Sequence, residues 1–105
     1  MIVIHIITKR EEQLNQIAEW LIKEKLVHGG VDIDYQDTFV LNEKEELVRT
    51  TTYKMQARTK GLLFNLIESG LRSNFHEDTP YLYSTPIVNM DRIQSKELID
   101  STLRI

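Results

Sequence analysis

Residues 1–35 read MIVIHIITKREEQLNQIAEWLIKEKLVHGGVDIDY, a strand, helix and strand in succession. The first seven residues form a β-branched run that includes His5, which is typical of a strand that the rest of the protein covers. Beyond Gly30, apolar and polar residues alternate from Val31 to Tyr35, which indicates a half-buried strand. Between the strands, apolar residues recur at steps of three and four, as on one face of an amphipathic helix. They are Leu14, Ile17, Ala18, Leu21, Ile22 and Leu26.

Local signals predict where this helix begins and ends. Thr8 and Glu11 have the spacing of a capping box, in which the threonine accepts an amide hydrogen bond and the glutamate reaches back. Gly29 and Gly30 are expected to end the helix, because the residue past a helix terminus often adopts a left-handed conformation. His28 precedes them and is expected to interact with the negative end of the helix dipole.

Residues 31–41 and 47–58 are expected to form a long hairpin with a polar tip between them. A second amphipathic helix is expected over residues 62–71, with Thr59 as its cap. Gly70 lies within this helix, where glycine costs about 1 kcal/mol relative to alanine. We therefore expect Gly70 to mark a close approach between two segments of backbone.

Residues 80–88 are expected to form the last strand, and they include Pro80 and Pro86. Proline donates no hydrogen bond to a sheet, so this strand should lie at an edge. Asp91 and Gln94 could cap a short terminal helix. The resulting β-α-β-β-α-β order predicts an α+β, ferredoxin-like fold. It would be an antiparallel four-stranded sheet with two helices on one face and a short C-terminal helix, in one domain spanning residues 1–105.

Composition excludes several classes of function. The 105 residues carry a net charge of −3, which argues against a broad nucleic-acid-binding surface. The absence of cysteine excludes disulfides and thiolate metal sites. The apolar start is too short to span a membrane. We therefore expect a soluble, cytoplasmic protein that contacts neither nucleic acid nor membrane.

Catalytic and RNA-binding signatures are not found. The strand over residues 47–58 has one aromatic residue, Tyr53, whereas an RNA-recognition domain needs several to stack bases. The turn after the first strand contains Arg10 but no glycine, so it cannot form the anion-binding loop of a small phosphatase. No serine lies in a nucleophile-elbow context. We do not expect an enzyme.

The second half of the chain carries a more specific pattern. Arg58-Thr59 is followed after a helix by Phe75, then Asp78, Pro80 and Pro86. This arrangement resembles the CutA divalent-cation-tolerance family, whose core reads K-T, a helix, and then H-P-Y-E-V-P-E-I-I-A-L-P-I. Thr59 is as far from Phe75 as the family threonine is from its histidine, and both prolines coincide. Upstream, Lys25 to Ile33 aligns with the family's E-R-L-A-A-C-V-N-I, so the resemblance covers nearly the whole chain.

The chain also departs from the family pattern. Phe75 stands in place of the family histidine, and His76 follows where the family has proline. Glu77 replaces a tyrosine and Tyr81 replaces the second glutamate. Gly30 replaces the cysteine, Asp32 replaces the asparagine, and the tryptophan expected near the hairpin tip is absent, since Trp20 lies on the first helix. The resemblance therefore implies a divergent member that keeps the architecture better than the ligand chemistry.

His76, Glu77 and Asp78 are the candidate metal-binding residues. They are contiguous at the segment where the family places its polar motif, and imidazole and carboxylate groups suit copper or zinc. Adjacent side chains do not readily converge on one ion, so a site there would need groups from a neighbouring chain. A solvated acidic loop is the simpler alternative.

Asp32, Asp34 and His5 could also bind a metal ion, but each has a simpler structural explanation. Asp32 and Asp34 share one strand face and could attract a cation, but they are more simply the solvated face of a sheet. His5 is more simply a core or interface residue than a metal ligand. No cofactor other than a possible divalent metal ion is indicated.

The resemblance implies a non-enzymatic homotrimer concerned with divalent cation binding, tolerance or homeostasis. The alternative is a PII-type protein, which shares the architecture and senses nucleotides or other small molecules. A third hypothesis is a purely structural trimer that binds no ligand. Phe39, Val40 and Leu41 would be exposed near the tip of an isolated hairpin, so we expect the hairpin and the C-terminal edge strand to pair with neighbouring copies. Clefts between subunits would then hold a metal ion or small metabolite.

Overall fold

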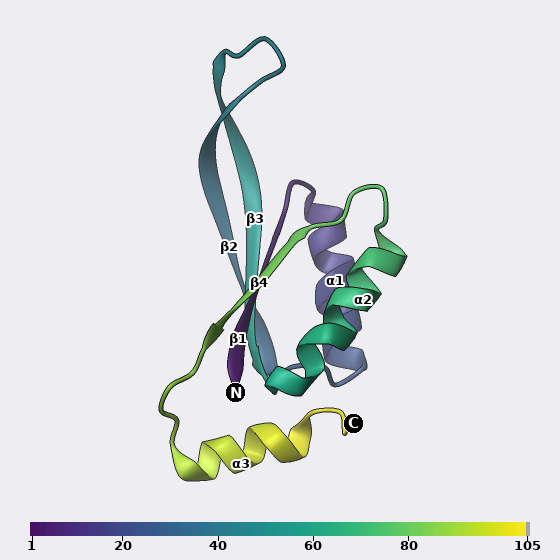
Figure 1. Ribbon diagram of the computed structural model, residues 1–105, viewed down its shortest axis with the longest axis vertical. Coiled ribbons are helices and arrows are strands. Elements are labelled where there is room, and N and C mark those ends of the chain that lie inside the picture. The colour runs from purple at the N-terminus through teal and green to yellow at the C-terminus, as the bar shows by residue number, and fades with distance from the viewer. Residues whose placement is uncertain (105) are drawn as a thin grey trace.

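The protein folds into one antiparallel sheet with two helices against one face and a third helix beyond its end (Figure 1). The computed structural model describes residues 1–104. Its strands run in the order β2-β3-β1-β4, with every neighbouring pair antiparallel, which confirms the predicted ferredoxin-like arrangement. The elements are β1 (Ile2–Thr8), α1 (Glu11–Lys23), β2 (His28–Leu41), β3 (Leu47–Thr59), the short 3₁₀ helix η1 (Gly61–Leu63), α2 (Phe64–Asn74), β4 (Tyr81–Pro86) and α3 (Arg92–Ser101).

The core lies between the sheet and the helices α1 and α2. Ile4 and Ile6 of β1 and Met55 of β3 point into it and are fully buried. The apolar stripe predicted for the first helix supplies the facing side chains. The buried apolar residues of this cluster are Ile4, Ile6, Leu14, Ile17, Leu21, Leu26, Val27, Met55, Ala57, Leu63, Ile67 and Leu71. The opposite face of the sheet carries no helix and is called the open face below (Figure 1).

The predicted ends of the first helix are wrong. No side chain caps α1, and Thr8 is instead the last residue of β1, where its hydroxyl accepts a hydrogen bond from the amide of Arg10 at 3.3 Å. At the other end, Lys25 adopts a left-handed conformation with φ 57°. The amides of Lys25 and Leu26 donate to Ile22 and Leu21, and this pair of bonds is the Schellman motif that ends many helices. The helix therefore ends several residues before the glycines.

Gly29 and Gly30 belong to β2. The register between β2 and β3 shifts between His28 and Asp32, and Gly29 has φ 71° at this irregularity. The expected contact of His28 with a helix dipole is wrong for the same reason. His28 begins β2, and its Nδ1 lies 2.6 Å from the hydroxyl oxygen of Ser101 after the chain has returned through α3.

Thr59 does not cap the second helix. It ends β3, is fully buried, and donates a 2.6 Å hydrogen bond to the carbonyl oxygen of Leu26. The expected cap at Asp91 is confirmed, and Gly70 marks a close approach as expected, but to the side chain of Trp20 and not to another segment of backbone. A Cβ atom at Gly70 would collide with the indole of Trp20, and the carboxylate of Asp91 accepts hydrogen bonds from the amides of Ile93 and Gln94 at the start of α3.

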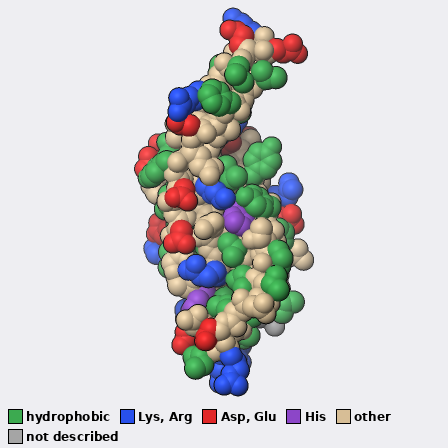
Figure 2. All heavy atoms as spheres, turned by 90° about the vertical axis from the view of Figure 1, so that its left-hand side faces the viewer, with side chains coloured by type: hydrophobic (Ala, Val, Ile, Leu, Met, Phe, Trp, Pro, Cys, Tyr) green, Lys and Arg blue, Asp and Glu red, His purple; other side chains and the backbone are tan. Residues whose placement is uncertain are grey.

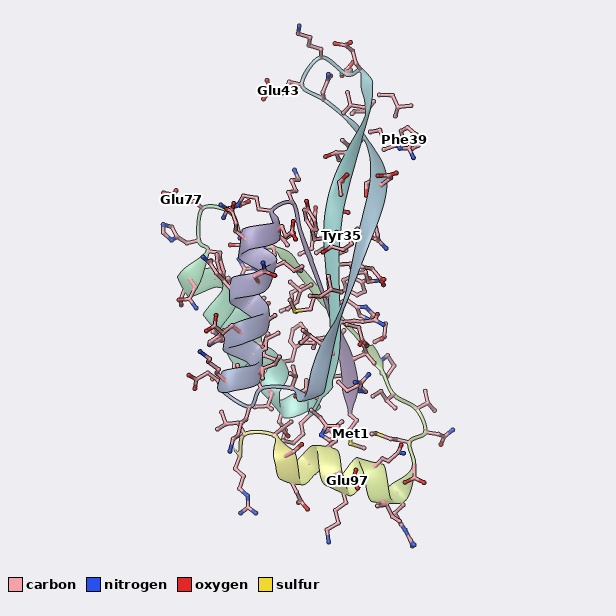
Figure 3. The ribbon with its side chains drawn as sticks, turned by 180° about the vertical axis from the view of Figure 1, so that it is seen from behind. Met1, Tyr35, Phe39, Glu43, Glu77 and Glu97 are labelled. Atoms are coloured by element: carbon pink, nitrogen blue, oxygen red, sulfur yellow. The ribbon has the colours of Figure 1, made fainter. Side chains whose placement is uncertain are left out.

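The hairpin of β2 and β3 extends well beyond the helices as an arm (Figure 1). The molecule measures 51 × 28 × 19 Å, and its radius of gyration of 15.2 Å exceeds the value of about 13 Å typical of a compact domain of this length. Figure 3 shows Phe39 near the outer end of the arm and Glu43 at its tip. Much of the arm therefore has no packing partner within residues 1–104. No helix in residues 1–104 is long and apolar enough to cross a membrane.

Candidate functional site

The predicted metal-binding segment lies on the loop between α2 and β4. All three side chains are exposed, and Glu77 points away from the arm (Figure 3). His76 Nε2 lies 3.8 Å from Glu77 Oε1, whereas Asp78 is drawn to another partner, the Nε of Arg10 at 3.1 Å. In the described part of the chain, no three histidine or carboxylate side chains are grouped so that they could hold a metal ion. A site at this segment would need groups from another subunit, as expected from the sequence.

Asp32 and Asp34 lie among cations. Asp32 is 3.7 Å from Arg58 Nη1, and Asp34 pairs in the sheet with Lys54. These neighbours already balance the two carboxylates, so the strand face has little excess negative charge to attract a metal ion. This geometry favours the interpretation that Asp32 and Asp34 belong to a solvated face of the sheet, and not to a cation site.

A groove of about 560 Å³ lies where the arm leaves the body of the protein. Its lining comes from three segments: the end of β1 with the start of α1, the arm, and the loop before β4. The lining residues are Ile7, Thr8, Lys9, Gln13, Gln36, Thr38, Val40, Thr52, Asp78, Thr79, Pro80 and Tyr81. A volume of this size suits a small organic molecule. Of the predicted metal-binding residues, only Asp78 lies in the groove.

A polar network connects α1 to the loop that carries Asp78. The Thr8 hydroxyl donates to Gln13 Oε1, and Gln13 Nε2 donates to the carbonyl oxygen of Asp78 at 2.7 Å. The ion pair with Arg10 then holds the Asp78 side chain. Gln13 is 1% exposed, so both ends of its amide are satisfied inside the protein, as burial of a polar group requires. This network positions one wall of the groove.

The lining of the groove consists mainly of neutral polar groups and apolar side chains. The hydroxyl oxygens of Thr38 and Thr52 lie 3.1 Å apart across the arm, next to Gln36 on the same strand face. Lys9 brings a cation that forms no ion pair with another described residue, and Tyr81 adds an exposed aromatic ring. Hydroxyl, amide and ammonium groups bind polar organic ligands more readily than a divalent metal.

Sequence reasoning found Asp78 but missed the rest of this groove. Gln36, Thr38, Thr52 and Lys9 were not among the residues that the sequence predicted to be functional. A usable signal was present, because Gln36 and Thr38 are two residues apart in a predicted strand and must share a strand face. The sequence does not show that Tyr81 and Lys9 meet that face.

His5 is placed at the open face, as the core-or-interface expectation requires. It is 9% exposed, and its ring stacks on Tyr83 with centroids 4.5 Å apart. Burial, followed by the charge of Lys54, lowers the pKa of His5 below its ordinary value. His5 is therefore a neutral imidazole near neutral pH.

The fold matches that of several solved proteins over nearly their whole lengths. The structure of CutA1 from Pyrococcus horikoshii superposes with a TM-score of 0.85 over 99% of this chain and 100% of that chain, at 15% identity. The chain has the fold of the CutA proteins. The periplasmic divalent cation tolerance protein CutA from Archaeoglobus fulgidus matches with a TM-score of 0.80 over 96% and 98%, at 20% identity. CutA1 from Oryza sativa matches with a TM-score of 0.83 over 99% and 94%, at 19% identity.

Searches against family models and curated proteins find no relative of the chain. The positions that first suggested CutA nevertheless have structural roles. Thr59 ties the end of β3 to Leu26, Pro80 lines the groove, and Pro86 ends the edge strand β4. Gly30 and Phe75, where the chain departs from the CutA pattern, lie outside the groove.

Proposed function

We propose that this chain is a non-enzymatic homotrimer of the CutA type that acts in tolerance to, or homeostasis of, divalent metal cations. The observation that carries the proposal is the end-to-end match of fold with proteins named for divalent cation tolerance, long arm included. The motif resemblance of the second half of the chain, through Thr59, Pro80 and Pro86, supports it independently of the superposition.

The exposed apolar residues of the arm support assembly into a trimer. Phe39, Leu41 and Leu47 are each more than 60% exposed and lie close together near the tip. Burying about 200 Å² of this surface would stabilise an assembly by about 5 kcal/mol per subunit. Three-fold closure would pair the arms and edges of all copies and leave no open strand.

The trimer is tested by replacing Phe39 and Leu41 with lysine. We expect this variant to be monomeric or aggregated in light scattering at micromolar concentration, because two cations would have to be buried in the interface. A Thr51→Lys variant adds a lysine at an exposed polar position of the same arm and should stay trimeric. Wild-type protein that is monomeric at micromolar concentration would overturn the trimer.

We place the metal ion at His76 and Asp78, with Glu77 as a further ligand and the remaining ligands supplied by a neighbouring subunit. Copper or zinc suits this combination of imidazole and carboxylate. Calorimetric titration of both metals should show binding that weakens at least tenfold when His76 and Asp78 are changed to alanine. The matched control removes the same side-chain types at the far end of the molecule, in His28→Ala with Asp100→Ala. Unchanged affinity in the first variant would refute this location.

A PII-type sensor of small molecules is the second candidate, and the groove favours it. Its hydroxyl and amide lining, the free cation of Lys9 and the exposed ring of Tyr81 suit an organic ligand. Titration with adenine nucleotides and other small metabolites separates the two functions. Binding of a nucleotide without any response to copper or zinc would favour the sensor, and no response to either set would favour a purely structural trimer.

A further inference from the structure

The carboxylate of Asp78 already has a cationic partner within the chain. The Nε atom of Arg10 lies 3.1 Å from Asp78 Oδ2, and the two side chains are 54% and 58% exposed. Arg10 precedes α1 and Asp78 lies on the loop before β4, so the pair joins segments that are 68 residues apart in the chain. A guanidinium group and a metal ion use the same carboxylate oxygens. Arg10 and a metal ion would therefore compete for Asp78.

Two other aspartates within residues 1–104 are paired with arginine in the same way. Asp32 lies 3.7 Å from Arg58 Nη1, and the Oδ2 of Asp37 lies 2.7 Å from Arg49 Nη2. Figure 2 shows this arrangement on the open face, where acidic side chains lie beside basic ones. Asp78 is the one of the three that directly follows a histidine and a glutamate in the chain. Here the arginine therefore neutralises a carboxylate of the proposed metal site.

The backbone at Asp78 is held independently of this ion pair. Gln13, which is buried, donates a 2.7 Å hydrogen bond from Nε2 to the carbonyl oxygen of Asp78. The amide of Asp78 donates to the carbonyl oxygen of Phe75 at 3.0 Å. Because both bonds involve backbone atoms of Asp78, its carboxylate can turn away from Arg10 while the loop stays in place. A metal ion can therefore take the carboxylate without any rearrangement of the loop.

The exposure of the ion pair sets the strength of this competition. Pairs between exposed side chains are weak, because water screens the charges and both side chains lose conformational freedom. A pair of this kind changes an equilibrium constant by roughly two- to fivefold. Arg10 therefore lowers the affinity for a metal ion that uses Asp78 but does not prevent its binding.

We propose that Arg10 competes with the metal ion for Asp78 and thereby makes the site selective for metals that bind imidazole. The inference rests on the proposed metal site and adds to it the residue that sets its affinity and selectivity. Copper and zinc bind imidazole, so they keep His76 as a ligand while Arg10 holds Asp78. Manganese and magnesium prefer oxygen ligands, so Glu77 is then the one side chain of the three that suits them.

The test compares manganese and zinc binding by the wild type and by Arg10→Gln. Calorimetry measures zinc, and the electron paramagnetic resonance signal of free Mn²⁺ measures manganese, both at low ionic strength, where the ion pair is least screened. Arg10→Gln should bind manganese roughly two- to fivefold more tightly than the wild type. Its gain for zinc should be smaller, because His76 contributes in both proteins. Arg10→Ala gives the same comparison if the glutamine variant fails to fold.

Arg72→Gln is the matched control for the change in charge. Arg72 lies in the last turn of α2 and lines a small hollow with Thr79 and Pro80, so it is close to the same loop. It forms no ion pair with another described residue. Its replacement removes one positive charge but leaves Asp78 paired with Arg10, so manganese affinity should change less than in Arg10→Gln. Equal gains in the two variants would indicate a general charge effect and overturn the inference.

An Asp78→Asn background shows whether Arg10 acts through this carboxylate. With no carboxylate left to release, Arg10→Gln should no longer raise manganese affinity in that background. A gain that persists there, or zinc binding by the wild type with no gain in manganese affinity in Arg10→Gln, overturns the role of Arg10 and leaves the metal site standing. If neither the wild type nor Arg10→Gln binds either metal, the metal site is refuted and this inference with it.

Discussion

Replacing Gly70 with alanine tests the packing of α2 against α1. The added Cβ would lie less than 3.0 Å from two carbon atoms at the far edge of the Trp20 ring and 3.5 Å from a third. Alanine improves helix propensity by about 1 kcal/mol, whereas overpacking of this kind costs about 1–3 kcal/mol. The collision should therefore prevail, and the free energy of unfolding should fall by about 1 kcal/mol, up to about 2 kcal/mol.

Gly61→Ala is the matched control. Gly61 begins η1, and a Cβ atom there would meet no atom within 4 Å. Without a collision, the lower conformational entropy of the unfolded alanine variant should raise stability by about 0.4–1 kcal/mol. The same substitution should therefore have opposite signs at the two positions.

A Trp20→Ala background isolates the collision. Truncation of Trp20 removes the ring that the new methyl group would meet, so Gly70→Ala should become stabilising by about 1 kcal/mol in that background. Thermal unfolding followed by circular dichroism measures the series, and 1 kcal/mol corresponds to about 4–8 °C in a domain of this size. Subunit concentration must be constant, because assembly shifts the midpoint. An equal rise in Tm for Gly70→Ala and Gly61→Ala, or an effect of Gly70→Ala that is unchanged by the loss of Trp20, would refute the reasoning.

Three other substitutions test the local structure. Lys25→Gly should raise stability by about 0.5–1 kcal/mol, because glycine adopts the left-handed conformation at the end of α1 without a Cβ penalty. Glu24→Gly is the control: this residue has a negative φ, so glycine should lower stability in the same denaturation assay. Asp91→Ala should cost about 1 kcal/mol and speed hydrogen exchange in α3, and protection that stays unchanged would show that the cap contributes nothing. Thr59→Val should cost about 1–3 kcal/mol because the carbonyl of Leu26 loses its buried donor, whereas Thr59→Ser should retain most of the stability.

The order of elements was predictable because its signals are local. The stripe of apolar residues at helical spacing over α1 and the alternation from Tyr53 to Arg58 in β3 each depend on residues a few positions apart, and both are found in the structure. The edge position of β4 followed from Pro80 just before the strand and Pro86 at its end, because proline cannot complete the hydrogen bonds of a central strand. The cap at Asp91 was equally local, since the carboxylate and the amides it binds are three residues apart or closer.

The ends of α1 and the role of Thr59 were not predictable in the same way. Lys25, not a glycine, takes the left-handed position, because burial of Leu26 in the core decides where the chain turns. Thr59 is a residue type that often caps helices, but its hydroxyl instead donates a hydrogen bond to the carbonyl oxygen of Leu26, 33 residues away in the chain. In both cases a distant contact outweighed a local preference.

The sequence by itself was enough to predict the order of helices and strands, the antiparallel sheet, and the loop around Asp78 as a candidate site. Only the tertiary structure decided that Asp78 turns to Arg10, that a groove joins Lys9 to the polar face of the arm, and that His5 is buried with an unpaired nitrogen. The physical reason is the range of the interactions. Periodicity and capping act between neighbours in the chain, whereas a groove and a desolvated imidazole require strands far apart in sequence to meet at fixed register.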